Sequence, residues 1–137
     1  MGDYSRFTYD NATLLKAAGL IAASAAGSTI LDLGDALMEA NLVIDVTALE
    51  VASGDEIYTI AIEGSNVAAM TSGSVVLAEK TLGNNPAPAD ADTALGRYVV
   101  PFRNELAGTV YRYVRIYTTV AGAIATGINY SAFLAKK

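Results

Sequence analysis

The sequence predicts an all-β protein built as an antiparallel sandwich or barrel. Three features predict this fold class. Apolar and polar residues alternate with period two in several segments after residue 41, glycine-rich turns separate these segments, and no helical patterns alternate with them. A parallel α/β sheet would need such helices. The 137 residues fit one domain, which we place at 35–137 after an arm over 1–34.

The first two predicted strands run over 42–47 and 57–63, with a turn at 53–55 between them. In both strands every second residue is apolar, which is typical of a strand with one buried face. The residues expected on these buried faces are Leu42, Ile44 and Val46 in the first strand, and Tyr58, Ile60 and Ile62 in the second.

Proline and glycine mark the boundaries of the next elements. A short strand over 75–78 leads to a long surface loop over 83–96, which contains two prolines and has no period. Pro101 lies near the end of the next strand, 97–102. It predicts an edge position or a bulge, because proline lacks the amide that a central strand donates. A turn is expected at 107–108.

The last two predicted strands run over 110–120, which is the longest, and 124–134, with a bend at 121–123 and a bulge at Gly127. In the longest strand, alternation separates two sets of side chains: Val110, Val114 and Ile116 on one side, and Tyr111, Tyr113, Arg115 and Tyr117 on the other. Tyrosine and arginine are enriched in interfaces. The second side therefore either meets a partner or lies beneath other strands, and the pattern leaves both readings open.

The arm over 1–34 has a different pattern. Its alanine content over 13–26 would permit a helix, but Gly19 and Gly27 weaken it and the apolar residues have no clean period. We therefore predict an extended arm with room for a helical turn. The arm residues expected to contact a partner are Phe7, Tyr9, Leu31 and Leu33.

Composition argues against most familiar catalytic chemistry. The chain contains no cysteine and no histidine, which removes disulfides, thiol and imidazole catalysis, and the zinc sites that use these ligands. We therefore expect no cofactor, no metal and no catalytic residue. Hydrophobic residues make up 53% of the chain and charged residues 17%, against about 25% charged on average. We infer a partner or self-assembly, with a well-buried domain of many small residues as the alternative.

The net charge of −5 is unevenly spread. Residues 1–69 hold two basic and ten acidic residues, a balance of −8, and residues 70–137 hold seven basic and four acidic, a balance of +3. Such polarity would steer docking onto a partner. Net acidity argues against nucleic-acid binding. The uncharged run 17–31 is shorter than the roughly 20 residues that cross a bilayer, and acidic residues before it argue against a secretory leader.

Three local patterns point weakly to other chemistry. The sequence from Asp90 begins like a calcium loop but lacks the later glycine and glutamate. Glu50, Asp55 and Glu56 could supply paired carboxylates for glycoside hydrolysis, although acidic residues in turns are usually just solvated. The eight tyrosines and three phenylalanines could line a sugar-binding groove, a reading that the absence of tryptophan weakens.

Four segments, 42–58, 96–105, 109–115 and 125–134, resemble the capsid cement, or head-decoration, proteins of short-tailed bacteriophages of the Bordetella-phage type. The resemblance covers most of the chain after the arm and includes no catalytic signature. It implies a jelly-roll-like β-sandwich that sits on the outside of an HK97-type shell and bridges neighbouring capsomers.

The resemblance also implies partners and a location. The partners would be the major capsid protein and further copies of the chain, with a dimer favoured over a trimer. The protein would be made in the host cytoplasm and end on the virion surface, without cofactor, catalysis, nucleic-acid binding or membrane binding. An extended arm suits this role, because such segments can add to the edge of a neighbour's sheet. A carbohydrate-binding sandwich is the alternative function.

Overall fold

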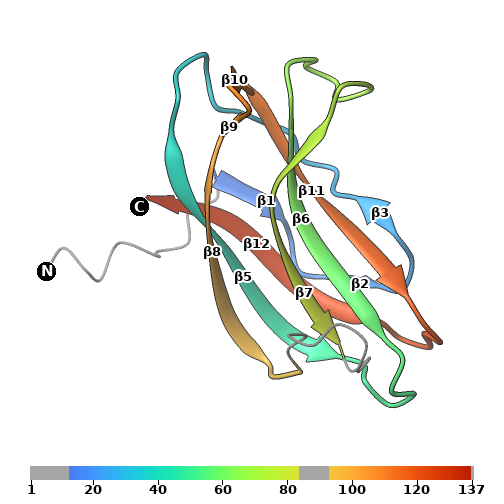
Figure 1. Ribbon diagram of the computed structural model, residues 1–137. Helices are drawn as coiled ribbons and strands as arrows, with labels where there is room; N and C mark the ends of the chain where they lie inside the picture. Colours follow the sequence, from blue (N-terminus) through green and yellow to red (C-terminus); the bar gives the residue numbers. More distant parts are fainter. Residues whose placement is uncertain (1–12, 84–92, 137) are drawn as a thin grey trace, which may run out of the picture.

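The computed structural model describes residues 13–83 and 93–136, which form an all-β protein (Figure 1). This confirms the predicted fold class. In chain order the strands are β1 (Leu14–Lys16), β2 (Leu20–Ile21), β3 (Ala25–Ala26), β4 (Leu31–Asp32), β5 (Glu39–Leu49), β6 (Ile57–Ser65), β7 (Val75–Gly83), β8 (Gly96–Arg103), β9 (Glu105–Leu106), β10 (Thr109–Val110), β11 (Tyr113–Ala121) and β12 (Ile128–Lys136).

Two antiparallel sheets pack face to face as a sandwich (Figure 1). Sheet A has the order β1-β12-β5-β8, and β2 also pairs with β12. Sheet B has the order β3-β11-β6-β7, and β4 also pairs with β11. The edge strands β7 and β8 contact each other at one side of the sandwich, while β1 to β4 line the opposite side. The hairpin β9–β10 lies at one end (Figure 1).

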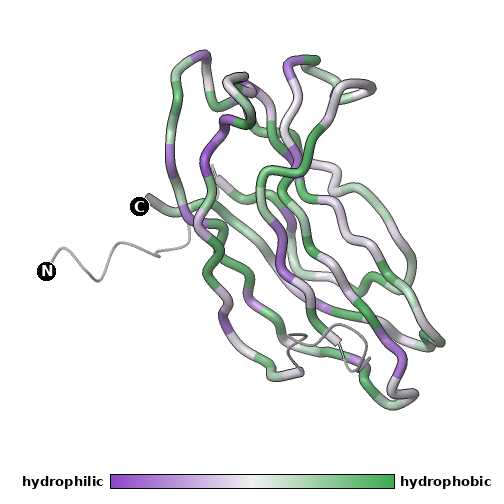
Figure 2. Tube along the Cα trace, in the orientation of Figure 1, coloured by the Kyte–Doolittle hydropathy of each residue, from purple (hydrophilic) through white to green (hydrophobic). Residues whose placement is uncertain are grey.

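The core lies between the sheets, where the alternating residues predicted it. The six residues expected on the buried faces of β5 and β6 are all at most 3% exposed: Leu42, Ile44, Val46, Tyr58, Ile60 and Ile62. Figure 2 shows hydrophobic stretches along these strands, with strongly hydrophilic positions few and scattered. Because each fully buried aliphatic side chain contributes about 1.5–3 kcal/mol, these two rows supply much of the stability.

One polar pair joins the two sheets across the core. Thr118 of β11 and Tyr130 of β12 are both buried, and their hydroxyl oxygens lie 2.5 Å apart. Burial raises the pKa of Tyr130 to about 12. The hydrogen bond satisfies hydroxyls that would otherwise be costly to bury, so it fixes how the sheets are aligned.

The edge and turn predictions for the second half are confirmed. β8, which contains Pro101, is an edge strand. The turn at 107–108 has positive φ at both residues, 52° at Ala107 and 87° at Gly108, as the hairpin turns that join twisted strands require. The strand predicted over 75–78 is longer than expected, because its pairing with β6 continues to Gly83.

The strand predicted over 110–120 is interrupted, which corrects the prediction that it is the longest. The amide of Tyr111 donates to the carbonyl of Asn104 at 2.6 Å, and the amide of Arg112 donates to the side-chain oxygen of Asn66 at 3.0 Å. These two residues therefore leave the ladder between β10 and β11. The longest strand is β5, with 11 residues.

The irregularity predicted at Gly127 lies slightly further along the chain. Gly127 ends the loop before β12 with φ of 93°, and the shift in register falls between Asn129 and Tyr130. A Cβ on Gly127 would lie 2.0 Å from the carbonyl oxygen of Ile21. Glycine is therefore required there by both its dihedral angle and the close approach of β2.

Residues 14–33, which we call the strap, run in extended form along one side of the sandwich. β1 and β2 pair with β12 of sheet A, and β3 and β4 pair with β11 of sheet B. The extended conformation predicted for this part of the arm is observed. Its separation from the domain is not confirmed, because the strap supplies strands to both sheets.

Candidate interaction surface

The outer face of sheet B carries the tyrosines and arginine of the predicted partner-facing strand. Tyr113, Arg115 and Tyr117 alternate along β11 with Val114 and Ile116, which are fully buried. The three outward side chains are half-buried, because residues of β6 and of the strap flank them on both sides. A strand with one buried and one outward face is thus confirmed from residue 113 onward.

Arg115 is held by an ion pair with Glu63 of β6. The two residues are direct cross-strand partners, and the Arg115 Nε lies 3.1 Å from the Glu63 Oε1. Their side chains are only 20% and 16% exposed. The arginine therefore presents a neutralised pair at the surface, so a partner would meet little net charge at this point.

Small and hydroxyl side chains surround this pair. Ala26 of β3 and Ala61 of β6 lie opposite Tyr117 on its two sides, and Val76 of β7 is opposite Glu63 and 47% exposed. We call this surface the Tyr/Arg face. It comprises Ala26, Thr59, Ala61, Glu63, Val76, Glu79, Thr81, Tyr113, Arg115, Tyr117 and Thr119.

Tyr111 does not lie on the Tyr/Arg face, which corrects the prediction that four residues of this segment share one side. A Cβ placed on Gly64 would lie 3.0 Å from the Tyr111 Cβ and 2.8 Å from Leu77. Gly64 pairs with Val114, whose side chain is in the core, so Tyr111 packs on the inner side of sheet B. The break in the ladder at residues 111–112 causes this change of side.

A network of charges fixes the strap beside β11. Arg112 binds Asp32 with two hydrogen bonds of 2.7 and 2.9 Å, and also reaches Asp35 at 3.3 Å. The hydrogen bond from Arg112, together with one from the amide of Gly34, lowers the pKa of Asp32 to about 2. The guanidinium also lies 5.4 Å from the centre of the Tyr113 ring. This end of the Tyr/Arg face is therefore ordered by paired charges.

Two of the arm residues expected to contact a partner, Leu31 and Leu33, do not join this surface. Leu31 and Leu33 pack against the core between the sheets, so their side chains serve the fold of their own chain. Phe7 and Tyr9 lie outside the described residues. Of the eight predicted contact residues, the structure places Tyr113, Arg115 and Tyr117 together.

Part of the uneven charge along the chain is paired within the described region, because arginines of the second half meet acidic residues of the first. Four arginines from the second half form ion pairs with acidic residues from the first half: Arg97 with Asp45, Arg103 with Glu39, Arg112 with Asp32, and Arg115 with Glu63. The predicted polarity is thus cancelled locally at these pairs.

The three acidic residues considered for hydrolysis are bound to backbone amides. Glu50 accepts hydrogen bonds from three consecutive amides, at residues 125–127, which lower its pKa. Asp55 accepts from the amide of Ala123, and the buried Glu56 accepts from residues 53 and 55. A general acid needs a raised pKa, whereas the pKa of Glu50 is lowered. All three carboxylates hold loops in shape.

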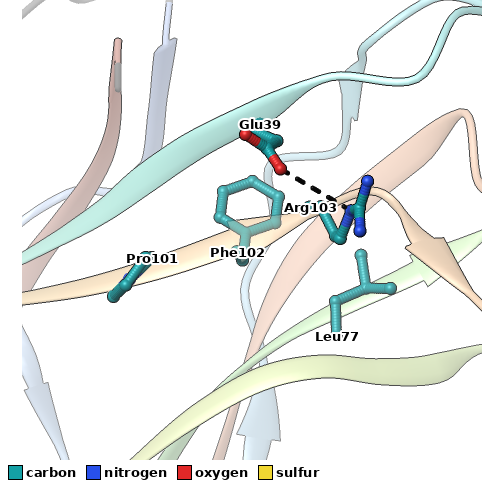
Figure 3. A pocket seen from close by; sticks show the side chains of 5 residues that line it. All are labelled: Glu39, Leu77, Pro101, Phe102 and Arg103. Carbon is teal, nitrogen blue, oxygen red and sulfur yellow. Dashed lines mark ion pairs between the residues drawn. The ribbon is translucent and has the colours of Figure 1, made fainter.

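A shallow hollow between β7 and β8 is the concave site shown in Figure 3. Leu77, Pro101 and Phe102 form its apolar part, and Glu39 and Arg103 face each other at its rim with 3.8 Å between Oε2 and Nε. Its volume of about 270 Å³ is below the usual range of ligand pockets. With its two charges paired to each other, it offers little to a small molecule.

Sequence reasoning missed several residues of the Tyr/Arg face. Glu63 could have been found, since pairing the predicted strand at 57–63 with 113–119 places opposite charges together. Ala26, Ala61 and Val76 gave no signal, because small and aliphatic residues occur equally on buried and exposed surfaces.

No protein-family model matches the sequence, and no curated protein matches it. Among the described residues there is no cluster of three acidic side chains that could hold a metal ion, and Asp90 lies outside them. That same part of the chain contains no helix long and apolar enough to span a bilayer.

Proposed function

We propose that this protein is a capsid cement protein that binds the outside of an HK97-type phage head through its Tyr/Arg face. It would contact the major capsid protein, bridge neighbouring capsomers and associate with other copies of itself. One observation carries this proposal. The outer face of sheet B has two half-buried tyrosines around a neutralised Arg115–Glu63 pair, the composition favoured in the centre of protein interfaces.

The two open sheet edges favour attachment through a face. β8 carries Pro101, and Arg97 and Arg103 at its ends. On β7, the Lys80 ammonium reaches across to the Tyr98 ring of β8 at 5.2 Å. Proline, surface charges and inward-pointing lysines all discourage a foreign strand from pairing with an edge. A broad face of low charge is then the better contact surface.

Strand order supports a jelly-roll type of sandwich. If β1 and β2 count as one interrupted strand, and β3 and β4 as another, each sheet holds four strand positions. The chain passes from one sheet to the other after β2, β4, β5, β7 and β11, and it also does so between β8 and β11 through the β9–β10 hairpin. Among the strands described, only β6 and β7 are consecutive and pair within one of these sheets. An eight-strand double sheet of this kind is the jelly-roll architecture of many capsid and lectin domains. The resemblance of four sequence segments to cement proteins supports the same assignment.

Phage heads stripped of the protein provide the test. Purified protein should rebind them, and heads without it should lose stability to heat. Tyr117→Ala should weaken binding at least about tenfold, as loss of a central aromatic anchor does, while Val99→Ala on the outer face of sheet A should not. Arg97→Ala, which breaks the Arg97–Asp45 pair on sheet A, is the matched control for Arg115→Ala. Failure of the wild-type protein to bind stripped heads would overturn the proposal.

A carbohydrate-binding module is the second candidate. Tyr113 and Tyr117 lie on one face of β11, about 13 Å apart along the strand, so both rings could contact a sugar chain. A glycan array distinguishes the two functions. Binding that is lost in both Tyr113→Ala and Tyr117→Ala would support this candidate, and an array without hits would remove it.

A further inference from the structure

The strap occupies the outer edges of β11 and β12 along almost their whole length. On β11, Asp32 and Leu31 pair with residues 113 and 114, and Ala26 and Ala25 with 117 and 118. Between these pairs, the amide of Gly27 donates to the carbonyl of residue 116 at 2.7 Å. On β12, β1 pairs with residues 132 and 133, and β2 with 128 and 129.

Apolar side chains of the strap also fill the gap between the two sheets on this side. Leu15 is fully buried, and Ile21, Leu31 and Leu33 pack against the core. The strap therefore does for this side what continuous edge strands would do. Without it, two sheet edges and the side of the core would be open to solvent.

The charged side chains of the strap bind near its two ends, whereas hydrogen bonds of Ser24 and of the Gly27 amide hold its middle. At the first end, the Lys16 ammonium donates to the carbonyls of Ala17, Gly19 and Tyr130 at 2.7–3.1 Å. At the second, Asp32 binds Arg112. Between them, the strap contains no charged residue, its paired strands are two residues long, and Leu20 is 61% exposed.

The connection from the strap to β5 has the features of a hinge. Gly34 has φ of +82°, and a Cβ there would meet nothing within 4 Å. On its far side, the buried Asn104 fixes the chain: its side chain donates to the carbonyl of Ala36 and accepts from the amide of Met38. Rotation at residues 34–35 would thus release the strap while β5 stays in place.

We propose that two copies of this chain exchange straps, each strap pairing with β11 and β12 of the other copy. The same contacts form in the exchanged and the closed protein, which is why exchange of an identical element is a low-cost route to a dimer. The 20 residues of the strap match the roughly 20–30 residues that each side contributes to a standard interface. This exchange deepens the self-association within the proposed function, but it requires no phage head.

Engineered cysteines test the exchange directly, because the chain has none of its own. Ala26 and Tyr117 are direct partners across β3 and β11. The variants Ala26→Cys and Tyr117→Cys are unfolded together, refolded at high concentration and oxidised. Exchange predicts a covalent dimer containing one chain of each variant. The matched control mixes Thr59→Cys with Thr119→Cys, partners on β6 and β11 that stay within one chain, and should give no such dimer.

Two further variants make the outcome decisive. The double variant Ala26→Cys/Tyr117→Cys should close within one chain when dilute and between chains when concentrated. Gly34→Val should raise the dimer fraction on the order of tenfold, because a β-branched residue disfavours the positive φ of the closed form. A mixed dimer no more abundant than in the Thr59/Thr119 control, with the double variant closing only within a chain, would overturn the proposal. The proposal would also be overturned if the protein were dimeric in solution but the Ala26→Cys and Tyr117→Cys variants formed no cross-link between chains. Both readouts use the protein alone, so failure to bind heads is a separate result.

Discussion

Single side chains in this protein act largely by fixing loops at the ends of the strands. Glu50 gathers three consecutive amides of the loop before β12, and Asn104 joins the start of β5 to the hairpin region. Tyr58 donates its hydroxyl proton to the carbonyl of Glu50 at 2.9 Å, and burial raises the pKa of Tyr58 to about 12. Polar residues that a sequence pattern assigns to solvent thus have structural partners.

Glu50→Gln should lower the melting temperature at neutral pH, because the amide loses the charge that strengthens its hydrogen bonds. The amides lower the pKa of Glu50 in the folded state. Its contribution is therefore complete above the unfolded pKa and is lost as the pH falls through the folded one. Thermal melts over this pH range should show the difference between wild type and variant shrinking in acid. A constant difference would contradict the role of the charge.

Gly127→Ala should destabilise the protein by at least about 3 kcal/mol, because it adds a clash with the carbonyl of Ile21 to the cost of positive φ. Gly73→Ala is the control, since Gly73 has φ of +67° with nothing within 4 Å of a Cβ, and should cost only about 1–2 kcal/mol. Urea denaturation measures both. Equal losses would mean that β2 moves aside without cost.

At the scale of strands, period-two alternation predicted the core-facing rows of β5, β6 and β11, because alternate residues of these strands point between the two sheets. Alternation failed to predict segments whose conformation is determined by pairing with, or hydrogen bonds to, another element. The strap has no period, since its two-residue pairings are determined by β11 and β12. The predicted side of the strand for Tyr111 was wrong, because hydrogen bonds to Asn66 and Asn104 redirect the backbone at residues 111–112. The Tyr/Arg face was only partly predictable from the sequence. Alternation predicts which residues of one strand share a side, but it does not predict which residues of the neighbouring strands lie beside them.

Lys16→Met should loosen the strap while leaving the body of the sandwich folded. The ammonium satisfies three carbonyls at the start of the strap and lies 4.3 Å from the centre of the Tyr130 ring. Burial lowers the pKa of Lys16, but hydrogen bonds to three carbonyl oxygens stabilise the charged ammonium. Hydrogen exchange at the amides of Gly27 and Leu33 should accelerate roughly tenfold, the effect of about 1–2 kcal/mol.

The matched control for this measurement is Lys80→Met, which removes a lysine from the opposite side of the sandwich. It should leave exchange at the strap amides unchanged. Equal acceleration in both variants would indicate global destabilisation and contradict a local role for Lys16.

For the molecule as a whole, the distribution of charge bears most directly on how it meets a partner. Ion pairs join the acidic first half of the sequence to the basic second half on the outer faces of both sheets, as Arg97–Asp45 does on sheet A and Arg115–Glu63 on sheet B. Exposed pairs such as Arg97–Asp45 contribute little to stability, about 0–1 kcal/mol. Their effect is to neutralise charge at the positions of the pairs, which suits contact with a surface through packing and not through long-range attraction.

Binding to phage heads should therefore depend weakly on salt. Between about 50 and about 500 mM salt, where exposed charges become strongly screened, the dissociation constant should change by less than about threefold. Arg115→Ala leaves the carboxylate of Glu63 without this partner on the Tyr/Arg face, so the variant should bind more weakly and with a steeper salt dependence. The double variant Arg115→Ala/Glu63→Ala should recover the shallow dependence. A wild-type affinity that falls tenfold or more with salt would show that charge attraction, and not packing of the Tyr/Arg face, drives attachment.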